Sequence, residues 1–562
     1  MTDSSPALKK NDYLIIIALL NFFVLLTLYQ FRALDDNRLV SWNWIFEGAD
    51  VPMFFFLIVI GIMAAFFLSR ITFVERGHGL FLFLSSFLIS ILFFGEPEVI
   101  VDASRYFTQA KHIEVYGLRY FIDEWGRGIK AWTDLPVVPM FYGLIFKLFG
   151  ESRLYMQIFT SLLFSSTILL TYKIGKALWD KETGFIAGAL LLGIPYIYTQ
   201  VPLMLVDIPA MFFLSLSVFT FIRALERGGI WPVLASISFF LSFYSKYSIW
   251  LMLSINGVIF LVFLLQRPEK RNPILKKGAA FAVIAGILIV TVFLYKYALF
   301  SGQIRLLQEY QGPGLRRWGE SYLSTFLFQI HPVISIAALY SLIAALRRKD
   351  LKYLIVLWLV VIIFVLQINR IRYTLPAFPM LALMASYGLR EIREKEVRRF
   401  LVSCAVLSSL ILSIFFYLPF LSRMSAVNLK DAGLFLDSSG IEEAEVITIT
   451  SEDNVINSAV SVPLLDIFTH KKLVFKYVPE DISVDAIKES SLRFTWEYSN
   501  PGYYYNESEY TNVAPMLVII SSESGQVMPD YILSRTEGRS LIRTFERSTG
   551  IFSYNTEVKV YQ

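Results

Sequence analysis

The chain has 562 residues, of which 56% are hydrophobic and 17% charged, and its mean hydropathy is +0.56. These values exclude a soluble globular protein. The net charge of +5 does not indicate nucleic-acid binding, because the Lys and Arg residues fall between apolar runs and not on one clustered face. The composition therefore predicts a polytopic membrane protein.

The first predicted element is an apolar run near 13–31, which has the length of a full membrane span and lacks a small-residue cleavage site. It is expected to be an anchor and not a signal peptide. Similar runs, separated by charged or turn-rich breaks, continue to a last one near 400–421. Together they predict about thirteen transmembrane helices.

The short segments between the predicted spans alternate in charge. "YKIGKALWDKE", "QRPEKRNPILKK" and "REIREKEVRR" are basic, whereas "ALDDNRLVSWNWIFEGAD" is acidic and aromatic. Because short cytoplasmic loops carry an excess of Lys and Arg, this pattern predicts a cytoplasmic N-terminus. An odd number of spans then puts the C-terminus outside, and the expected location is the cell membrane.

Three segments depart from simple spanning. The apolar stretch 135–150 is short and carries two prolines, which favours an interfacial or re-entrant helix. The outer loop 301–331 is rich in Gly, Arg and aromatic residues, and we interpret it as a mobile lid. From 422 onward, turn signals and strand-like stretches such as "EVITITS" and "MLVIISS" predict an extracytoplasmic α/β domain.

The first outer loop holds a polar stretch, "VDASRYFTQAKH". Its spacing places Asp102, Arg105, Tyr106 and Gln109 on one face of a helix. Such a stripe combines an acid, a cation and two hydrogen-bonding groups, as a catalytic face would. The alternative is that Asp102 caps the helix and Arg105 contacts lipid headgroups.

Further polar residues lie at the edges of other predicted spans. Asp207 sits in an otherwise apolar span, where a carboxylate is costly unless it faces a cavity or a partner. Lys246 lies at a predicted outer turn, and Arg370, Arg372 and Tyr373 lie at the outer end of another span. For each cation taken alone, contact with phosphate headgroups is the preferred interpretation. Their convergence on one membrane side predicts a site that deprotonates a nucleophile and holds a phosphate-bearing lipid.

Metal and nucleotide motifs are missing from the sequence. The four histidines lack metal-ligand spacing, and no HExxH, CxxC, P-loop or strand-linked GxGxxG occurs. A divalent ion could bind Glu96, Glu98 and Asp102, but a solvated acidic loop is the preferred interpretation. We therefore expect no required cofactor and no metal site.

The ordered set of these segments resembles the GT-C membrane glycosyltransferases. "VDASRYFTQAKHI" is followed by "DLPVVPMFYGLIFKLFG", "LMLVDIPAMFFLSL", "YSKYSIWLM" and "RIRYTLPAFPML". The likeness covers roughly 94–389 and is greatest to the branch that holds protein O-mannosyltransferases and bacterial lipid A aminoarabinose transferases. It implies the following organisation: two additional N-terminal spans in 1–76, a catalytic core in 77–421 with outer loops 95–135 and 301–331, and the soluble domain in 422–562.

The resemblance also implies roles for single residues. Asp102 matches the catalytic base and Asp207 the second acid of the family. The residues expected to bind substrate or phosphate are Arg105, Tyr106, Lys246, Arg370, Arg372 and Tyr373. The sequence departs from the family at Ala103, where a Glu usually follows the Asp, so any role of that acid is lost or moved. Asp134 replaces the family's Lys or His, so a phosphate contact is expected from Lys130 or Lys246 instead.

The implied function is inverting transfer of a sugar from a polyprenyl (dolichyl or undecaprenyl) monophosphate to a hydroxyl of a protein, lipid or glycan acceptor. The other expected partners are membrane lipids, and no nucleic acid is expected. Two other functions stay open. A lipid or solute transporter or flippase would also place charges within the membrane. An oligosaccharyltransferase-like enzyme is a further alternative, because "FTWEYSNPG" faintly resembles that family's Trp-Trp-Asp-Tyr-Gly motif.

Overall fold

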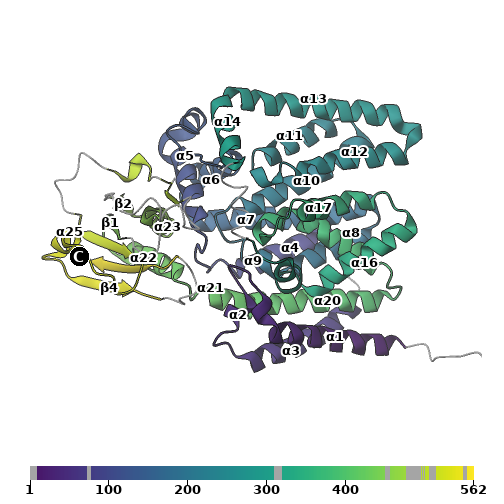
Figure 1. The fold of residues 1–562 in the computed structure, drawn as a ribbon, viewed down its shortest axis with the longest axis horizontal. Coiled ribbons are helices and arrows are strands. Elements are labelled where there is room, and N and C mark those ends of the chain that lie inside the picture. The colour runs from purple at the N-terminus through teal and green to yellow at the C-terminus, as the bar shows by residue number, and fades with distance from the viewer. Residues whose placement is uncertain are drawn as a thin grey trace, which may run out of the picture. The chain divides into compact units, whose positions relative to one another are not determined.

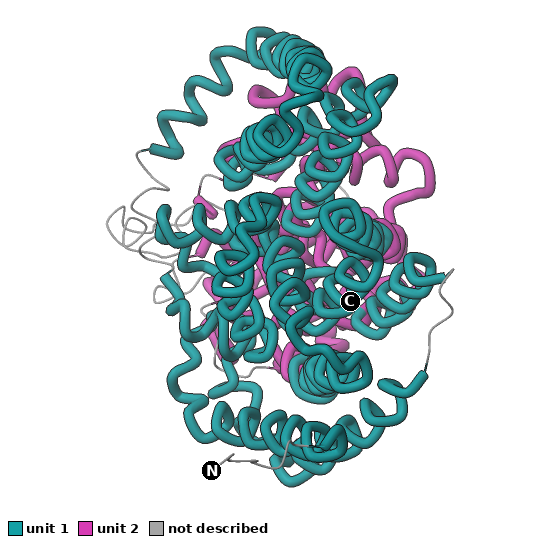
Figure 2. The backbone as a smooth tube through the Cα atoms, turned by 90° about the vertical axis from the view of Figure 1, so that its right-hand side faces the viewer, with its two compact units in different colours: residues 1–93, 160–201, 207–418 teal, residues 94–159, 202–206, 419–562 magenta. Residues whose placement is uncertain are grey.

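The computed structural model describes residues 9–71, 77–308, 319–449, 456–475, 495–496, 498, 500–505, 514–547 and 554–562. The chain folds into two compact units (Figure 2). Unit 1 comprises residues 1–93, 160–201 and 207–418, and unit 2 comprises residues 94–159, 202–206 and 419–562. Residues 95–135, the predicted first outer loop, therefore fold together with the C-terminal region.

Unit 1 is built from helices (Figure 1). The longer ones are α1 (Lys10–Gln30), α3 (Val51–Arg70), α4 (His78–Ile91), α7 (Arg153–Leu178, which starts in unit 2), α8 (Lys181–Leu192), α10 (Asp207–Arg227), α11 (Trp231–Phe243), α12 (Ile255–Gln266), α13 (Arg271–Tyr295), α14 (Tyr297–Leu306), α16 (Pro332–Arg348), α17 (Tyr353–Val365), α19 (Phe378–Leu389) and α20 (Lys395–Leu412). The short turns are η1 (Arg32–Leu34), α2 (Trp42–Ile45), α9 (Pro195–Tyr198), η2 (Tyr247–Ile249), η3 (Met252–Ser254), η4 (Pro268–Lys270), η6 (Ser324–Gln329), α18 (Ile371–Thr374), η7 (Leu375–Ala377), η8 (Ser413–Tyr417) and, at the junction with unit 2, α21 (Leu418–Leu421).

Seven helical segments among the described residues are long and apolar enough to cross a membrane. They are Lys10–Gln30, Val51–Arg70, Arg153–Leu178, Asp207–Arg227, Tyr247–Gln266, Pro268–Tyr295 and Lys395–Leu421, and the shorter apolar helices are His78–Ile91, Val137–Phe149, Trp231–Phe243 and Tyr353–Val365. The count of about thirteen crossings stays a prediction. One predicted crossing, 184–200, is divided because α8 ends before Pro195, whose ring disfavours a continuing helix.

The outer helices of unit 1 expose apolar side chains. In α13, which runs beside α11 and α12 (Figure 1), Val283, Ile287, Val290 and Leu294 are each more than half exposed at helical spacing. An apolar stripe of this kind suits contact with lipid. By contrast, α10 is buried along most of its length. This helix therefore lies inside the unit, and its first residue is Asp207.

Unit 2 combines helices with a small sheet. Its elements are α5 (Asp102–Glu124), α6 (Val137–Phe149), α22 (Ala426–Ser438), η9 (Ser458–Val460), α23 (Ser461–Asp466), η11 (Gly502–Tyr504), α25 (Asp530–Thr536), and strands β1 (Glu443–Ile449), β2 (Lys472–Phe475), β3 (Met516–Ser521), β4 (Leu541–Phe545) and β5 (Glu557–Tyr561). The strand order is β2-β1-β3-β5-β4, with β1 parallel to both neighbours and β5 antiparallel to both of its own. The predicted α/β region is confirmed.

The core of the sheet is formed by alternating apolar residues. Ile447 and Ile449 of β1 pack with Leu517 and Ile519 of β3, and Ile532 of α25 covers them. Because successive side chains of a strand point to opposite faces, this alternation fixes which face of the sheet is buried under α25.

Helices α5 and α6 approach each other closely. At Gly143 of α6, a Cβ atom would lie 2.6 Å from the carbonyl oxygen of Ala110, so only glycine fits. The predicted short apolar helix at 135–150 is confirmed as α6. Of the predicted lid at 301–331, residues 309–318 lie outside the described ranges, and the parts on either side form the end of α14 and η6.

Candidate active site

Three predicted site residues meet in unit 1. Asp207 is fully buried, and its Oδ2 accepts a hydrogen bond from Nε of Arg372 at 2.8 Å. Nζ of Lys246, from the turn between α11 and η2, forms an ion pair with Oδ1 of the same carboxylate. Arg372 is itself buried, with 4% of its side chain exposed. One buried carboxylate thus holds two cations in place.

The other two predicted residues of this segment join the same group. The ring of Tyr373 has Nζ of Lys246 at 4.9 Å and Cζ of Arg370 at 5.3 Å from its centroid. Aromatic faces attract cations in this arrangement. Tyr373 therefore links Arg370 to the ion pairs of Asp207, and we call these five residues the Asp207 cluster: Asp207, Lys246, Arg370, Arg372 and Tyr373.

A second carboxylate near this group was not predicted. Glu320 is buried and accepts hydrogen bonds from the backbone N–H of Ile371 at 2.9 Å and of Arg38 at 3.3 Å. Burial raises the pKa of Glu320, and the charge of Arg370 opposes that rise. Three cations against the two carboxylates Asp207 and Glu320 leave an excess of one positive charge. Such an excess is complementary to an anion.

In unit 2, the polar side chains predicted to share one face of α5 contact Asp134, which was not predicted to belong to this group. Nη2 of Arg105 lies 3.4 Å from Oδ1 of Asp102 and 3.4 Å from Oδ1 of Asp134. Gln109 donates from Nε2 to Oδ2 of Asp134 at 2.9 Å, and the hydroxyl of Tyr106 also hydrogen-bonds this carboxylate. We call this group the Asp102 cluster: Asp102, Arg105, Tyr106, Gln109 and Asp134.

The alternative that Asp102 caps α5 is wrong. Val101 occupies the N-cap position, and Asp102 is the first residue of the helix. Its carboxylate faces Arg105 instead. Ala103, where the resemblance implies a Glu, is fully buried, and the second carboxylate of the cluster comes from Asp134.

The Asp102 cluster has a charge balance opposite to that of the Asp207 cluster. Two carboxylates share one guanidinium, which leaves an excess of one negative charge. Burial raises the pKa of Asp134, while Arg105 and the hydrogen bond from Gln109 oppose the rise. A carboxylate in such a group is suited to accept a proton.

The interpretation of Glu96 and Glu98 as a solvated loop is wrong. Their exposed fractions are 0% and 2%. Oε1 of Glu98 accepts a hydrogen bond from Nε of Arg153 at 2.9 Å, and its Oε2 accepts one from the backbone N–H of Met204 at 3.2 Å. Burial raises the pKa of both carboxyl groups. Within the described ranges, no group of three or more His, Cys, Asp or Glu residues is arranged to hold a metal ion.

A buried acid also organises the loop after α1. Asp35 accepts hydrogen bonds from Oγ of Ser324 at 2.5 Å, Nε2 of Gln329 at 2.8 Å, and the backbone N–H groups of Trp42 and Asn37. Burial raises the pKa of Asp35 to about 7. The segment 35–42 is thereby attached to η6. Sequence gave no signal for this, since Asp35 sits beside the equally acidic Asp36.

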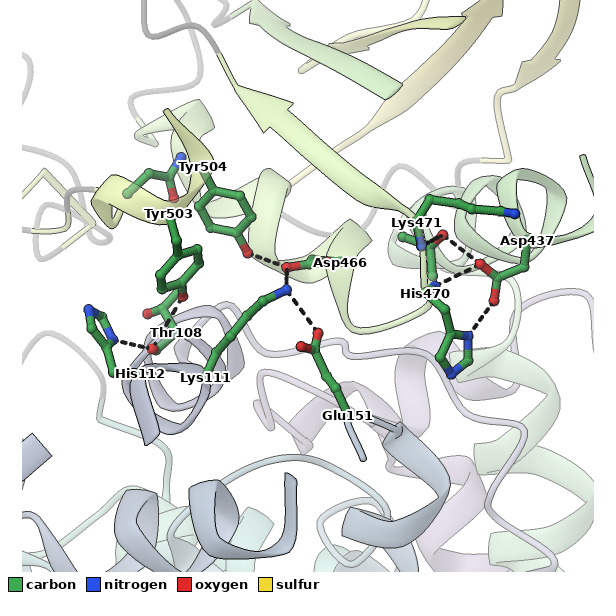
Figure 3. Close-up of polar contacts among 12 residues, drawn as sticks. Thr108, Lys111, His112, Glu151, Asp437, Asp466, His470, Lys471, Tyr503 and Tyr504 are labelled. Carbon is green, nitrogen blue, oxygen red and sulfur yellow. Dashed lines mark hydrogen bonds and ion pairs between the residues drawn. The ribbon is translucent and has the colours of Figure 1, made fainter. Parts of the chain in front are cut away.

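The C-terminal region contacts α5 through a third charged group (Figure 3). Nζ of Lys111 lies 2.6 Å from Oδ2 of Asp466 and 3.0 Å from Oε1 of Glu151. The hydroxyl of Tyr504 donates to Asp466 at 2.5 Å, and that of Tyr503 donates to the carbonyl oxygen of Thr108 at 3.3 Å. These contacts fix α5 against the segment 501–505.

Comparison with known proteins gives one family match and several structural ones. The family described as dolichyl-phosphate-mannose-protein mannosyltransferase matches residues 133–295. No curated protein sequence matches the chain. ArnT from Cupriavidus metallidurans bound to undecaprenyl phosphate has a similar structure at 11% identity, with a TM-score of 0.54 over 86% of this chain and 98% of that chain. The archaeal oligosaccharyltransferase AglB from Archaeoglobus fulgidus, in complex with an inhibitory peptide and a dolichol-phosphate, is 14% identical, with a TM-score of 0.45 over 80% of this chain and 70% of that chain.

The apolar helices and the likeness to ArnT define a multi-pass membrane protein with a GT-C fold. The family match runs from the residue before Asp134 to the end of α13, and so includes Asp207 and Lys246. The family match over 133–295 and the GT-C fold together indicate the enzyme class, a membrane glycosyltransferase. The fold class and the enzyme class expected from the ordered motifs are thus confirmed.

Proposed function

We propose that the chain transfers a sugar from a polyprenyl monophosphate to an acceptor hydroxyl at the extracytoplasmic face of the membrane. The observation that carries this proposal is the pair of cations held by the buried Asp207. Positive charge at the end of a helix that suits a membrane span is complementary to the phosphate of a lipid. The undecaprenyl phosphate bound by ArnT and the mannosyltransferase family match support the same class of donor.

In this proposal the Asp207 cluster binds the donor phosphate. Lys246 and Arg372 stabilise the negative charge that grows on the phosphate as the glycosidic bond breaks. Arg370 adds a third cation beside Tyr373. Asp207 is a positioning residue, since both of its carboxylate oxygens are engaged by the two cations. These cations supply the charge that a metal would, so the proposed reaction requires none.

Asp102 acts as the general base. It takes the proton of the acceptor hydroxyl while the hydroxyl oxygen attacks the anomeric carbon. The bond from that carbon to the phosphate oxygen breaks, and the polyprenyl phosphate leaves with the electron pair. Displacement in line inverts the anomeric centre. Arg105 orients Asp102, and Tyr106 and Gln109 hold Asp134, which shares Arg105 with the base.

The test is a transfer assay with the full chain in liposomes. A panel of dolichyl- and undecaprenyl-phosphate sugars is offered with protein, lipid and glycan acceptors, with and without EDTA. We expect turnover of at least one donor, with the product inverted, in the presence of EDTA. Transport of a solute across the liposome without turnover of any donor would contradict the proposal and favour a transporter.

A further inference from the structure

We propose that a cavity of unit 2 binds one saccharide ring, which deepens the proposed function and rests on it. The cavity lies between α5, the turn at 128–132 and the C-terminal residues 498 and 500–502. Its lining includes Gln109, His112, Lys130, Trp132, Tyr498 and Asn500. Arg105, which holds Asp102, lines it as well. The ring would belong either to the donor sugar or to a glycan acceptor.

The size of the cavity suits a single ring. Its volume is about 130 Å³. A cavity on the order of 150 Å³ holds one benzene molecule, so this one takes a six-membered ring and little more. Trp132 is half-buried, and Tyr498 is 7% exposed. Two aromatic side chains thus supply apolar surface for the C–H faces of such a ring.

Two hydrogen-bond acceptors of α5 lie in the wall of the cavity. Gln109 donates both N–H contacts of its amide, to the carbonyl oxygen of Lys130 and to Asp134, which fixes the orientation of the amide. Its Oε1 is buried, and no donor among the described residues contacts it. Nδ1 of His112 lies 2.6 Å from the carbonyl oxygen of Thr108, so Nδ1 carries the proton. The neutral ring then offers Nε2 as an acceptor.

The position of the His112 ring is fixed by its neighbours. The ring stacks on Tyr120. It also meets the edge of Tyr503, whose hydroxyl donates to the carbonyl oxygen of Thr108 (Figure 3). Burial lowers the pKa of His112, which keeps the imidazole neutral. The wall on the C-terminal side is equally fixed, because the hydroxyl of Tyr498 donates to Oδ1 of Asn500 at 2.7 Å. The side chains on both sides of the cavity are therefore held in place by their own contacts.

The two acceptors favour a saccharide over a peptide. Gln109 and His112 are three residues apart on a helix, so their side chains are neighbours on one face. Filling both requires a ligand that presents two donors side by side. Neighbouring hydroxyl groups of a sugar ring do this, whereas the side chain of a Ser or Thr acceptor presents one hydroxyl.

Binding of simple glycosides to the full chain in nanodiscs tests the inference without any transfer step. Saturation-transfer NMR is recorded with methyl mannoside, methyl glucoside and methyl N-acetylglucosaminide as probes. We expect at least one to bind, with affinity lowered roughly three- to tenfold in His112→Phe, the effect of losing one hydrogen bond. His112→Gln, which keeps an acceptor, is expected to restore part of the binding. Trp132→Ala is a second, independent variant with an expected loss of about tenfold.

His470→Phe is the matched control, because His470 of unit 2 is 71% exposed and pairs with Asp437 away from the cavity lining. If the ring is the donor sugar, KM for the donor rises in His112→Phe. If it belongs to a glycan acceptor, only KM for that acceptor rises. Glycoside binding that is equal in the wild type and both variants would overturn the inference. The inference would also be overturned if the wild type bound a Ser-containing peptide but no glycoside, and if both variants lost that peptide binding.

Because the readout is binding, its outcome is separate from that of the proposed transfer. A chain that binds glycosides through His112 and Trp132 but turns over no polyprenyl-phosphate sugar would refute the proposed function alone. A chain that transfers sugar but binds no glycoside in this cavity would refute the inference alone.

Discussion

The two charged clusters of this chain are built from the same kinds of side chain in opposite proportion. In unit 1, the carboxylate of Asp207 is shared by Lys246 and Arg372. In unit 2, the guanidinium of Arg105 is shared by Asp102 and Asp134. A cluster with excess positive charge is complementary to an anion, and one with excess negative charge favours taking up a proton. The proposed function accordingly assigns donor binding to the first cluster and activation of the acceptor to the second.

The largest expected effect comes from removing the proposed base, Asp102. Asp102→Asn keeps the size of the side chain and its contact with Arg105, but it cannot accept a proton. We expect the kcat for sugar transfer to fall by about 10²- to 10⁴-fold, the usual contribution of a general base. Asp437→Asn, which alters a carboxylate of the same unit that pairs with His470, is the control and should keep full activity. Equal kcat in Asp102→Asn and the wild type would remove Asp102 from this role.

Removing the carboxylate of Asp207, which Lys246 and Arg372 share, should lower the stability of the fold. Asp207→Asn leaves the charges of Lys246 and Arg372 buried without their counter-ion. Loss of one partner of a buried ion pair typically costs about 3–5 kcal/mol. We expect the free energy of unfolding in detergent to fall by that amount, measured by denaturant titration. Glu47→Gln, an exposed acid that follows α2, should change it by less than about 0.5 kcal/mol. A small effect at Asp207 would show that the two cations do not depend on it.

A single cation of the Asp207 cluster should affect donor binding. In Lys246→Met the charge is lost while the length of the side chain is nearly kept. A hydrogen bond to a charged group contributes about 1.5–3 kcal/mol, so we expect KM for the donor to rise roughly 10- to 100-fold. Lys176→Met removes an exposed cation at the end of α7 and should leave KM unchanged. A rise in KM for the acceptor alone would contradict the assignment.

The smallest expected effect concerns a third cluster, formed by Lys111, Glu151 and Asp466. Like the Asp102 cluster, it has one cation and two carboxylates. Burial raises the pKa of Glu151 to about 7 and that of Asp466 to about 6, although Lys111 opposes both shifts. The folded chain then binds protons that the unfolded chain releases above pH 4–5, so the free energy of unfolding falls as pH rises to about 7.

Glu151→Gln removes one of these titrating groups. We expect the fall in unfolding free energy between pH 5 and pH 8 to shrink by on the order of 2 kcal/mol. Thermal unfolding in detergent across this pH range measures it, with Glu47→Gln, an exposed acid, as the control. An unchanged pH profile would show that Glu151 is already ionised in the folded chain at pH 5.

The sequence predicted most polar residues of the two clusters, but it did not predict all of the residues that they contact. Asp207 was identified because a charge in an apolar span is costly, and Lys246 and Arg372 because they lie at the outer edges of predicted spans. The structure brings these three residues together. The face formed by Asp102, Arg105 and Gln109 followed from helical spacing. Asp134 was missed as a member, since the turn that brings it to Arg105 depends on how α6 packs on α5.

Burial was the property that the sequence predicted least well. Glu96 and Glu98 lie in a polar stretch and were expected to be solvated, yet both are buried beside Arg153. Arg153 lies more than fifty residues along the chain, and local pattern does not indicate such a long-range partner. The hydrogen bonds of Asp35 to Ser324 and Gln329 span nearly three hundred residues and were invisible for the same reason.

A comparison of two variants in one assay tests directly whether the two clusters have separate tasks. Steady-state transfer by Asp102→Asn and Lys246→Met is measured in the same liposomes, over a range of donor concentrations at saturating acceptor. We expect Asp102→Asn to lower kcat at nearly unchanged donor KM, whereas Lys246→Met should raise donor KM. If both variants changed the same parameter to the same extent, the division of labour would be wrong.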